Sequence, residues 1–200
     1  MNEFKQIIEQ YSAIIVIIFL LYTLYLCTFL PLLKRRYQVS KIFKQLQEID
    51  IFYQDLSIET MVNEIYEALN EALKLGDESL VKEFLTPHLY ENWLIKMNWV
   101  SYSRNFNSNR KSKITTCLPI GIKTLTEGKD EIWIYVRGHH GNSFYERKVV
   151  KQHHKIVNQA INKEFIEYWK FIRDEDHLYL DKIYEKNEIN LKEIPCTNQR

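Results

Sequence analysis

The chain has 200 residues, of which 46% are hydrophobic and 26% charged, with a formal net charge of +1 at pH 7. This composition excludes a disordered polymer, and the near-neutral charge argues against a dedicated nucleic-acid binder, so we expect no nucleic-acid partner. Cys27, Cys117 and Cys196 are too few and too widely spaced to predict a disulfide framework or a zinc site.

An uncharged apolar run at residues 13–33 predicts a transmembrane helix. At about 1.5 Å per residue, a helix of this length spans roughly 30 Å, the thickness of the hydrocarbon core of a bilayer. The preceding short tail, residues 1–12, carries two acidic residues against one lysine, and no small-residue cleavage site follows the run. These features favour an uncleaved single-pass anchor over a signal peptide.

Five basic residues follow the anchor, within a segment at residues 34–51 that we interpret as a basic juxtamembrane linker and amphipathic helix: Lys34, Arg35, Arg36, Lys41 and Lys44. By the positive-inside rule, they place the soluble domain on the cytoplasmic side of the membrane, or on the matrix side in a mitochondrion. They also make anionic lipids a candidate partner. The apolar residues at helical spacing, from Ile42 to Ile49, suit a helix that lies on the bilayer or one that packs on its own domain.

Residues 52–186 have the pattern of one folded domain in which helices precede strands. Periodicity and capping residues predict one helix between Ser57 and Gly76, a second at residues 78–85 and a third beginning at Pro87. Alternating residues then predict strands at 114–126, 131–138, 144–151, 165–173 and 178–184, before a polar, frayed tail at 187–200. This order predicts an α+β fold, with about three helices packed on an antiparallel sheet.

No residue pattern in the chain predicts catalysis or a bound metal. The histidines occur as adjacent pairs, His139–His140 and His153–His154, and neighbours on a strand point to opposite faces of the sheet. The chain has no glycine-rich phosphate loop and no nucleophile motif. We therefore expect a protein that is not an enzyme and that holds no metal or other cofactor.

Two residue sets are open to a structural and a functional interpretation. Four tryptophans either line an apolar pocket for a ligand or partner, or form ordinary core: Trp93, Trp99, Trp133 and Trp169. Four basic residues around an asparagine-rich loop form either a solvated face or a contact surface for anionic lipid or an acidic partner: Arg104, Arg110, Lys111 and Lys113.

The run from Phe165 to Arg173 reads Phe-x-Glu-x-Trp-x-Phe-x-Arg, and Leu178, Leu180 and Ile183 follow it. These residues resemble a signature of the domain family named for subunit forty-four of the mitochondrial inner-membrane translocase. The Gly76-Asp77 turn and the helix start at Thr86-Pro87 resemble the same family, so that the likeness covers roughly residues 52–185. Leu178 departs from the pattern, since the family usually has tryptophan there.

The resemblance implies the cone-shaped α+β fold of the nuclear-transport-factor-two-like superfamily. It also implies a noncatalytic domain that recruits or tethers a protein partner, in the context of protein translocation or membrane-protein assembly. Two alternatives share the fold. The first is a structural component of a secretion or conjugation machine that faces outward, and the second is a small-molecule-binding or isomerase-like enzyme. The enzyme requires an ionisable residue inside the cone.

Overall fold

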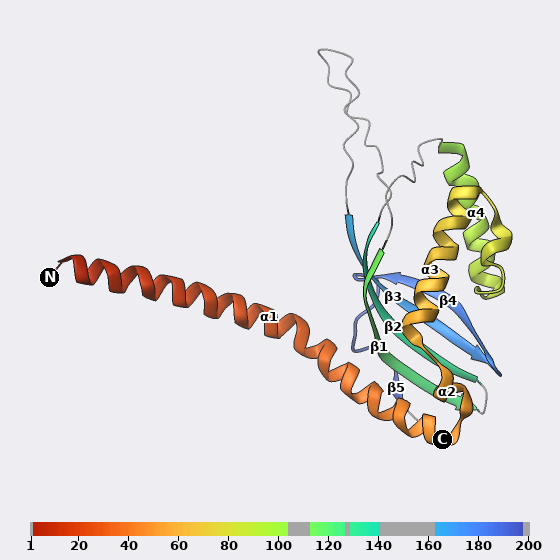
Figure 1. Ribbon diagram of the computed structural model, residues 1–200, viewed down its shortest axis with the longest axis horizontal. Coiled ribbons are helices and arrows are strands. Elements are labelled where there is room, and N and C mark those ends of the chain that lie inside the picture. The colour runs from red at the N-terminus through yellow and green to blue at the C-terminus, as the bar shows by residue number, and fades with distance from the viewer. Residues whose placement is uncertain (1, 104–112, 127–128, 141–162, 198–200) are drawn as a thin grey trace, which may run out of the picture.

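The computed structural model describes residues 2–103, 113–126, 129–140 and 163–197 (Figure 1). These residues form an α+β structure with a long N-terminal helix and a five-stranded mixed sheet. The strand predicted at residues 144–151 lies outside the described residues.

Helix α1 (Asn2–Ile49) is continuous through the predicted tail, the apolar run and the juxtamembrane segment. It is long and apolar enough to cross a membrane, judged by length and composition, and none of its most apolar stretch is buried against the protein. Pro31 lies inside the helix. A proline removes one backbone hydrogen bond and lets a helix bend, and α1 curves toward the sheet in its second half (Figure 1).

The juxtamembrane part of α1 packs on its own domain. Val39 and Leu46 are 0% exposed, and Ile42 and Phe43 pack against the same core. Burying an aliphatic side chain of this size contributes about 1.5–3 kcal/mol, so α1 is docked on the domain rather than loosely tethered to it. Of the two interpretations of the amphipathic segment, the structure shows this one.

Four short or medium helices follow α1: α2 (Ile51–Asp55), α3 (Ile58–Leu75), the 3-10 helix η1 (Glu78–Val81) and α4 (Pro87–Ser103). The helix predicted between Ser57 and Gly76 is confirmed, and Gly76 ends it in the left-handed region at φ 69°. The helix predicted at residues 78–85 is wrong beyond its first turn, because only η1 forms there. The sequence did not predict α2, which Asp50 caps by accepting a hydrogen bond from the backbone N–H of Phe52.

Five strands form one sheet in the order β4-β3-β2-β1-β5. They are β1 (Lys113–Thr126), β2 (Lys129–His140), β3 (Lys163–Asp174), β4 (His177–Glu185) and β5 (Cys196–Thr197). The first four are antiparallel neighbours, as predicted. The sheet is nevertheless mixed, because β5 pairs with β1 in the parallel sense.

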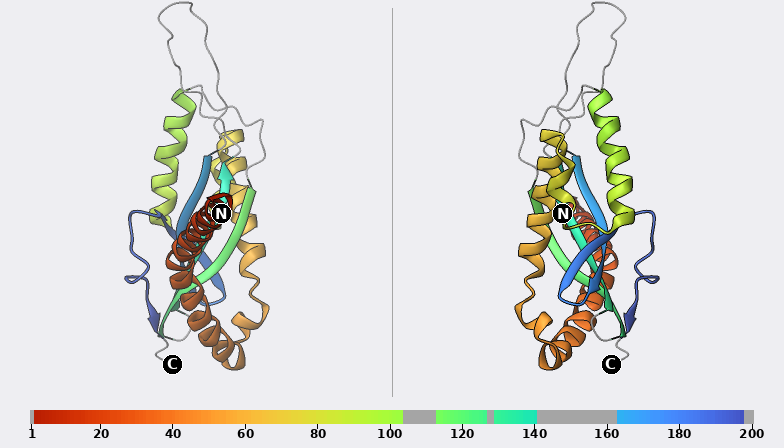
Figure 2. Two further views of the ribbon diagram at one scale, coloured as in Figure 1. Left: turned by 90° about the vertical axis from the view of Figure 1, so that its left-hand side faces the viewer. Right: turned by 90° about the vertical axis from the view of Figure 1, so that its right-hand side faces the viewer.

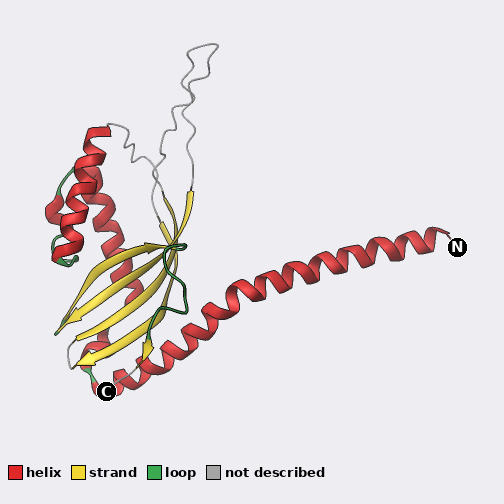
Figure 3. Cartoon of the chain, turned by 180° about the vertical axis from the view of Figure 1, so that it is seen from behind, coloured by secondary structure: helices red, strands yellow, loops and turns green. Residues whose placement is uncertain are grey.

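Both faces of the sheet are covered. Along β2, Ile132, Ile134 and Val136 belong to the core shared with the helices, while Trp133 and Tyr135 belong to a second core on the opposite face. Figures 2 and 3 show α3 and α4 on one face and the C-terminal segment on the other. We call these the helical face and the outer face.

The C-terminal segment closes the outer face, so the expectation of a frayed tail is wrong for residues 187–197. Ile194 is 1% exposed and packs with Trp133 and Tyr135. Gly121 allows this close approach, since a Cβ atom there would lie 2.3 Å from Cγ2 of Ile194 and 2.8 Å from the carbonyl oxygen of Pro195.

Candidate functional site

A buried polar cluster joins the end of α1 to the sheet. It consists of Asp50, Tyr53, Asp130 and Arg173, and we call it the polar joint. Arg173 Nη2 donates a hydrogen bond to Asp50 Oδ1 at 3.2 Å, and Nη1 reaches Asp50 Oδ2 and, at 3.5 Å, Asp130 Oδ2. The Tyr53 hydroxyl donates to Asp130 Oδ2 at 2.6 Å. Arg173 is 5% exposed and Asp130 is 1% exposed, so these charges interact with little screening by water.

The electrostatics of the polar joint favour a charged guanidinium beside carboxylates. Burial alone would lower the pKa of Arg173, but the hydrogen bond and the negative charge of Asp50 outweigh it and raise that pKa. Burial and the hydrogen bond to Asp130 raise the pKa of the Tyr53 hydroxyl. Tyr53 therefore stays a neutral donor, and the four side chains connect the end of α1 to the sheet.

The polar joint gives a physical role to the last residue of the Phe-x-Glu-x-Trp-x-Phe-x-Arg run. Residues at every second position of β3 share one face of the sheet, and Phe165, Trp169 and Phe171 lie in the core of the helical face. Arg173 continues this series at the end of the strand, where it meets the corner between α1 and α2. Its guanidinium carbon lies 4.0 Å from the centre of the Phe52 ring, a cation–π contact that fixes this ring.

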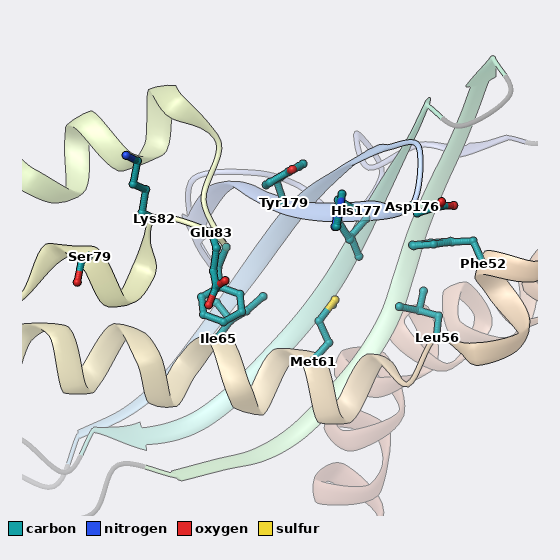
Figure 4. A pocket seen from close by; sticks show the side chains of 12 residues that line it. Phe52, Leu56, Met61, Ile65, Ser79, Lys82, Glu83, Asp176, His177 and Tyr179 are labelled. Carbon is teal, nitrogen blue, oxygen red and sulfur yellow. The ribbon is translucent and has the colours of Figure 1, made fainter.

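Phe52 also lines an open cavity of about 870 Å³, which we call the groove. Its floor is apolar and consists of Phe52, Leu56, Met61, Ile65, Phe84 and Leu178. Its rim is polar and consists of Ser79, Lys82, Glu83, Asp176, His177 and Tyr179. Figure 4 shows Leu56 and Met61 extending from the helical side toward His177 on β4. An apolar floor with a few polar groups at its edge is typical of binding sites.

A second cavity, of about 630 Å³, shares Lys82 and Tyr179 with the groove. It continues to Asp130 and Arg173 of the polar joint. The groove and the polar joint are therefore adjacent.

Glu167 is a carboxylate on the helical face, away from the polar joint. Glu167 accepts a hydrogen bond from Trp169 Nε1 at 2.8 Å. Burial raises the pKa of Glu167, although the bond from Trp169 and the charge of Lys96 oppose this shift. The interior is thus not purely apolar, but Glu167 lines neither of the two cavities described above.

The predicted membrane-proximal basic residues have two different environments. Lys34, Arg36, Lys41 and Lys44 are exposed on α1. Arg35 is half-buried, and its Nη2 atom donates a hydrogen bond at 2.7 Å to the carbonyl oxygen of Leu191 in the C-terminal segment. Arg35 therefore contributes to docking the helix in addition to its positive charge.

The predicted tryptophans do not line one shared pocket among the described residues. Trp93 and Trp169 belong to the core of the helical face, whereas Trp133 stacks on Tyr184 across the outer face, with ring centres 5.4 Å apart. The side chain of Trp99 lies outside the described residues. For the other three, the structure favours the interpretation as core.

The predicted basic loop is described only at its end, where Lys113 is exposed at the start of β1. Arg104, Arg110 and Lys111 lie outside the described residues, as do His153 and His154. Within the described part of the chain, no group of three or more histidine, cysteine, aspartate or glutamate side chains is arranged to hold a metal ion.

Sequence reasoning missed the polar joint. Asp50 lies between Ile49 and Ile51, where the only available signal was that of a helix cap. Asp130 lies at the start of a strand and could not be paired with Arg173 without the register of β2 against β3. In the sequence, Arg173 stands out only as the last residue of the Phe-x-Glu-x-Trp-x-Phe-x-Arg run.

Comparison with known proteins adds no assignment. No family model matches the chain, and no curated protein matches it.

Proposed function

We propose that the chain is a membrane-anchored, noncatalytic binding module that holds a protein partner at the inner face of a membrane. One observation carries this proposal: an apolar helix long enough to cross a membrane continues directly into a domain that has an open groove. Because α1 enters the domain without a break, the groove stays at a restricted distance and orientation from the bilayer.

The resemblance to the translocase-subunit family supports the same function and also a cone-shaped fold. In a fold of this kind, about three helices pack on a strongly curved sheet to make a cone. The residues of the signature explain how helices are held on one face of the sheet. Phe165, Trp169 and Phe171 are buried against the helices, and Arg173 at the end of the strand binds Asp50. The partner belongs to protein translocation or membrane-protein assembly.

The exposed residues Lys34 and Arg36 support a cytoplasmic or matrix location for the domain, since basic residues beside an anchor stay on that side. They also lie where anionic lipid headgroups would meet the helix. A reporter fused after Arg200 tests this topology. Activity only outside the cytoplasm would contradict it and would favour a component of a secretion machine.

Photo-crosslinking from the rim of the groove tests the binding function in intact membranes. A photoreactive amino acid at Lys82 or Tyr179 should form a specific protein adduct, whereas the same group at the exposed Glu188 should not. Identical adducts from all three positions, or none from the rim, would contradict a partner in the groove.

A change in the groove floor supplies the matched control. Met61→Glu places a charge among apolar lining residues and should abolish the adduct. Ile95→Glu makes the same chemical change at a side chain that is 65% exposed on α4, and should leave the adduct intact. Loss of the adduct in both variants would indicate unfolding or a partner bound elsewhere.

The enzyme alternative rests on Glu167, whose raised pKa is the kind of perturbation that acid–base catalysis uses. A substrate would have to reach that carboxylate, and Glu167 lines neither cavity. Glu167 is therefore not placed to act on a substrate bound in either cavity.

A further inference from the structure

The exposed face of α1 carries two lysines in line with a tyrosine, which we call the basic stripe. Tyr37, Lys41 and Lys44 are spaced four and then three residues apart, which places them on one side of the helix. The buried residues Val39 and Leu46 lie on the opposite side and dock α1 onto the domain. Tyr37 is 75% exposed, so the stripe points away from the protein.

The exposed face of α3 carries an acidic stripe of the same length. Glu64, Glu67 and Glu71 are exposed and are spaced three and then four residues apart, opposite the buried Ile65 and Leu69. Like charges three and four residues apart on a helix repel each other, so a cationic neighbour would stabilise this face.

Within the described part of the chain, neither stripe is joined to another side chain by an ion pair. None of the ion pairs there involves Lys41, Lys44 or the three glutamates of α3. Figures 1 and 2 show α1 and α3 diverging from the corner formed by α2, so the two faces do not meet within one molecule.

We propose that the basic stripe of α1 binds the acidic stripe of α3 on a second copy of this chain. The spacings match when the helices approach in the antiparallel sense, since Lys44 then faces Glu64, Lys41 faces Glu67, and the Tyr37 hydroxyl faces Glu71. The two surfaces differ, so the contact is heterologous and links copies into a ring or a row in the plane of the membrane.

The anchor makes such a contact effective. Exposed ion pairs are individually weak, but confinement to one membrane raises the effective concentration of neighbouring copies. Lys41 and Lys44 also lie about 12 and 16 Å along the helix from Leu33, at about 1.5 Å per residue. That is longer than the Debye length of about 8 Å at physiological salt, which favours a protein neighbour over the lipid surface for these two lysines.

Reversing the charges of each stripe in the full-length protein tests the contact. Chains carrying donor or acceptor fluorophores are reconstituted into uncharged phosphatidylcholine vesicles, and energy transfer between copies is measured against dilution with lipid. The lysine variant is K41E/K44E and the glutamate variant is E64K/E67K. Both leave Lys34, Arg35 and Arg36 unchanged, so the charges that orient the anchor are retained.

Each variant alone should associate about tenfold or more weakly than the wild type, and the wild-type signal should fall at high salt. A mixture of the two variants should recover association, because the unchanged basic α1 of E64K/E67K can bind the unchanged acidic α3 of K41E/K44E, and the acidic α1 of the latter can bind the basic α3 of the former. This recovery also shows that both variants are folded. K186E/K192E, which changes two exposed lysines outside both stripes, should behave as the wild type.

Absence of energy transfer in the wild type, its persistence in both variants, or failure of the mixture to recover it would overturn the proposal. So would a result in which K41E/K44E weakens only adhesion to vesicles of anionic lipid, because the stripe would then be a lipid contact. The proposal does not depend on the groove, since groove variants such as Met61→Glu leave both stripes intact.

Discussion

Removal of the Arg173 guanidinium should destabilise the domain and release the end of α1. Arg173 faces Asp50 and Asp130 from the end of β3, and all three lie at the point where α1 meets the sheet. Replacing Arg173 by methionine keeps a similar length of apolar side chain but leaves two carboxylates without the cation that faces them. The side chain of Asp130 is 0% exposed, so water cannot replace the lost interaction.

We expect Arg173→Met to lower the free energy of unfolding by about 3–5 kcal/mol, the usual cost of removing one partner from a buried ion pair. Arg137→Met supplies the control, because it makes the same substitution on the neighbouring strand. Arg137 pairs with Glu164, but the two side chains are 38% and 42% exposed. Water screens this pair, so the control should leave stability nearly unchanged.

Urea unfolding in mild detergent, followed by tryptophan fluorescence, measures both changes. The double variant Arg173→Met/Asp130→Asn should recover part of the loss, since the asparagine carbonyl still accepts the bond from Tyr53 and no longer carries a charge. Equal, small effects of Arg173→Met and Arg137→Met would refute the view that the polar joint holds α1 to the sheet.

Three further predictions concern the interior and the C-terminal segment. Burial raises the pKa of Glu167 above its ordinary 4.5, so its contribution to stability is full below that value and is lost as the pH rises through the folded-state pKa. Glu167→Gln should therefore be more stable than the wild type at pH 7 and lose this part of the pH dependence, as measured by urea unfolding at several pH values. Gly121→Ala places a Cβ against Ile194 and should cost about 1–3 kcal/mol, with faster proteolysis of residues 186–197 than in the wild type. Burial raises the pKa of the Cys117 thiol to about 12, so iodoacetamide at pH 8 should label Cys117 slowly in the folded protein and rapidly in urea.

Local patterns predicted the elements whose signals lie within a few residues. The alternation of Ile132, Ile134 and Val136 with Trp133 and Tyr135 predicted strand β2 and the two faces of the sheet. Gly76 ended α3 as expected, because only a residue tolerant of positive φ fits there. The apolar run predicted a helix, although not that it would continue to Ile49 without a break.

Features that depend on distant partners could not be predicted in the same way. Asp50 and Arg173 are separated by more than half the chain, and only the folded register brings them together. Residues 187–197 have a polar average composition, which concealed that Ile194 is buried against the outer face. The groove likewise combines residues from α2, α3, η1 and β4, so no single stretch of sequence predicts it.

We propose that α1 both spans the membrane and docks on the domain as one continuous helix. Pulsed electron paramagnetic resonance in lipid nanodiscs tests it most directly, with spin labels at Ile18 in the apolar part of α1 and Lys182 on β4 and with the native cysteines replaced. A Gly/Ser insertion after Arg36 provides a flexible reference. The structure predicts one narrow distance distribution for the uninterrupted chain and a broad one for the reference. Equally broad distributions for both would contradict a docked anchor helix.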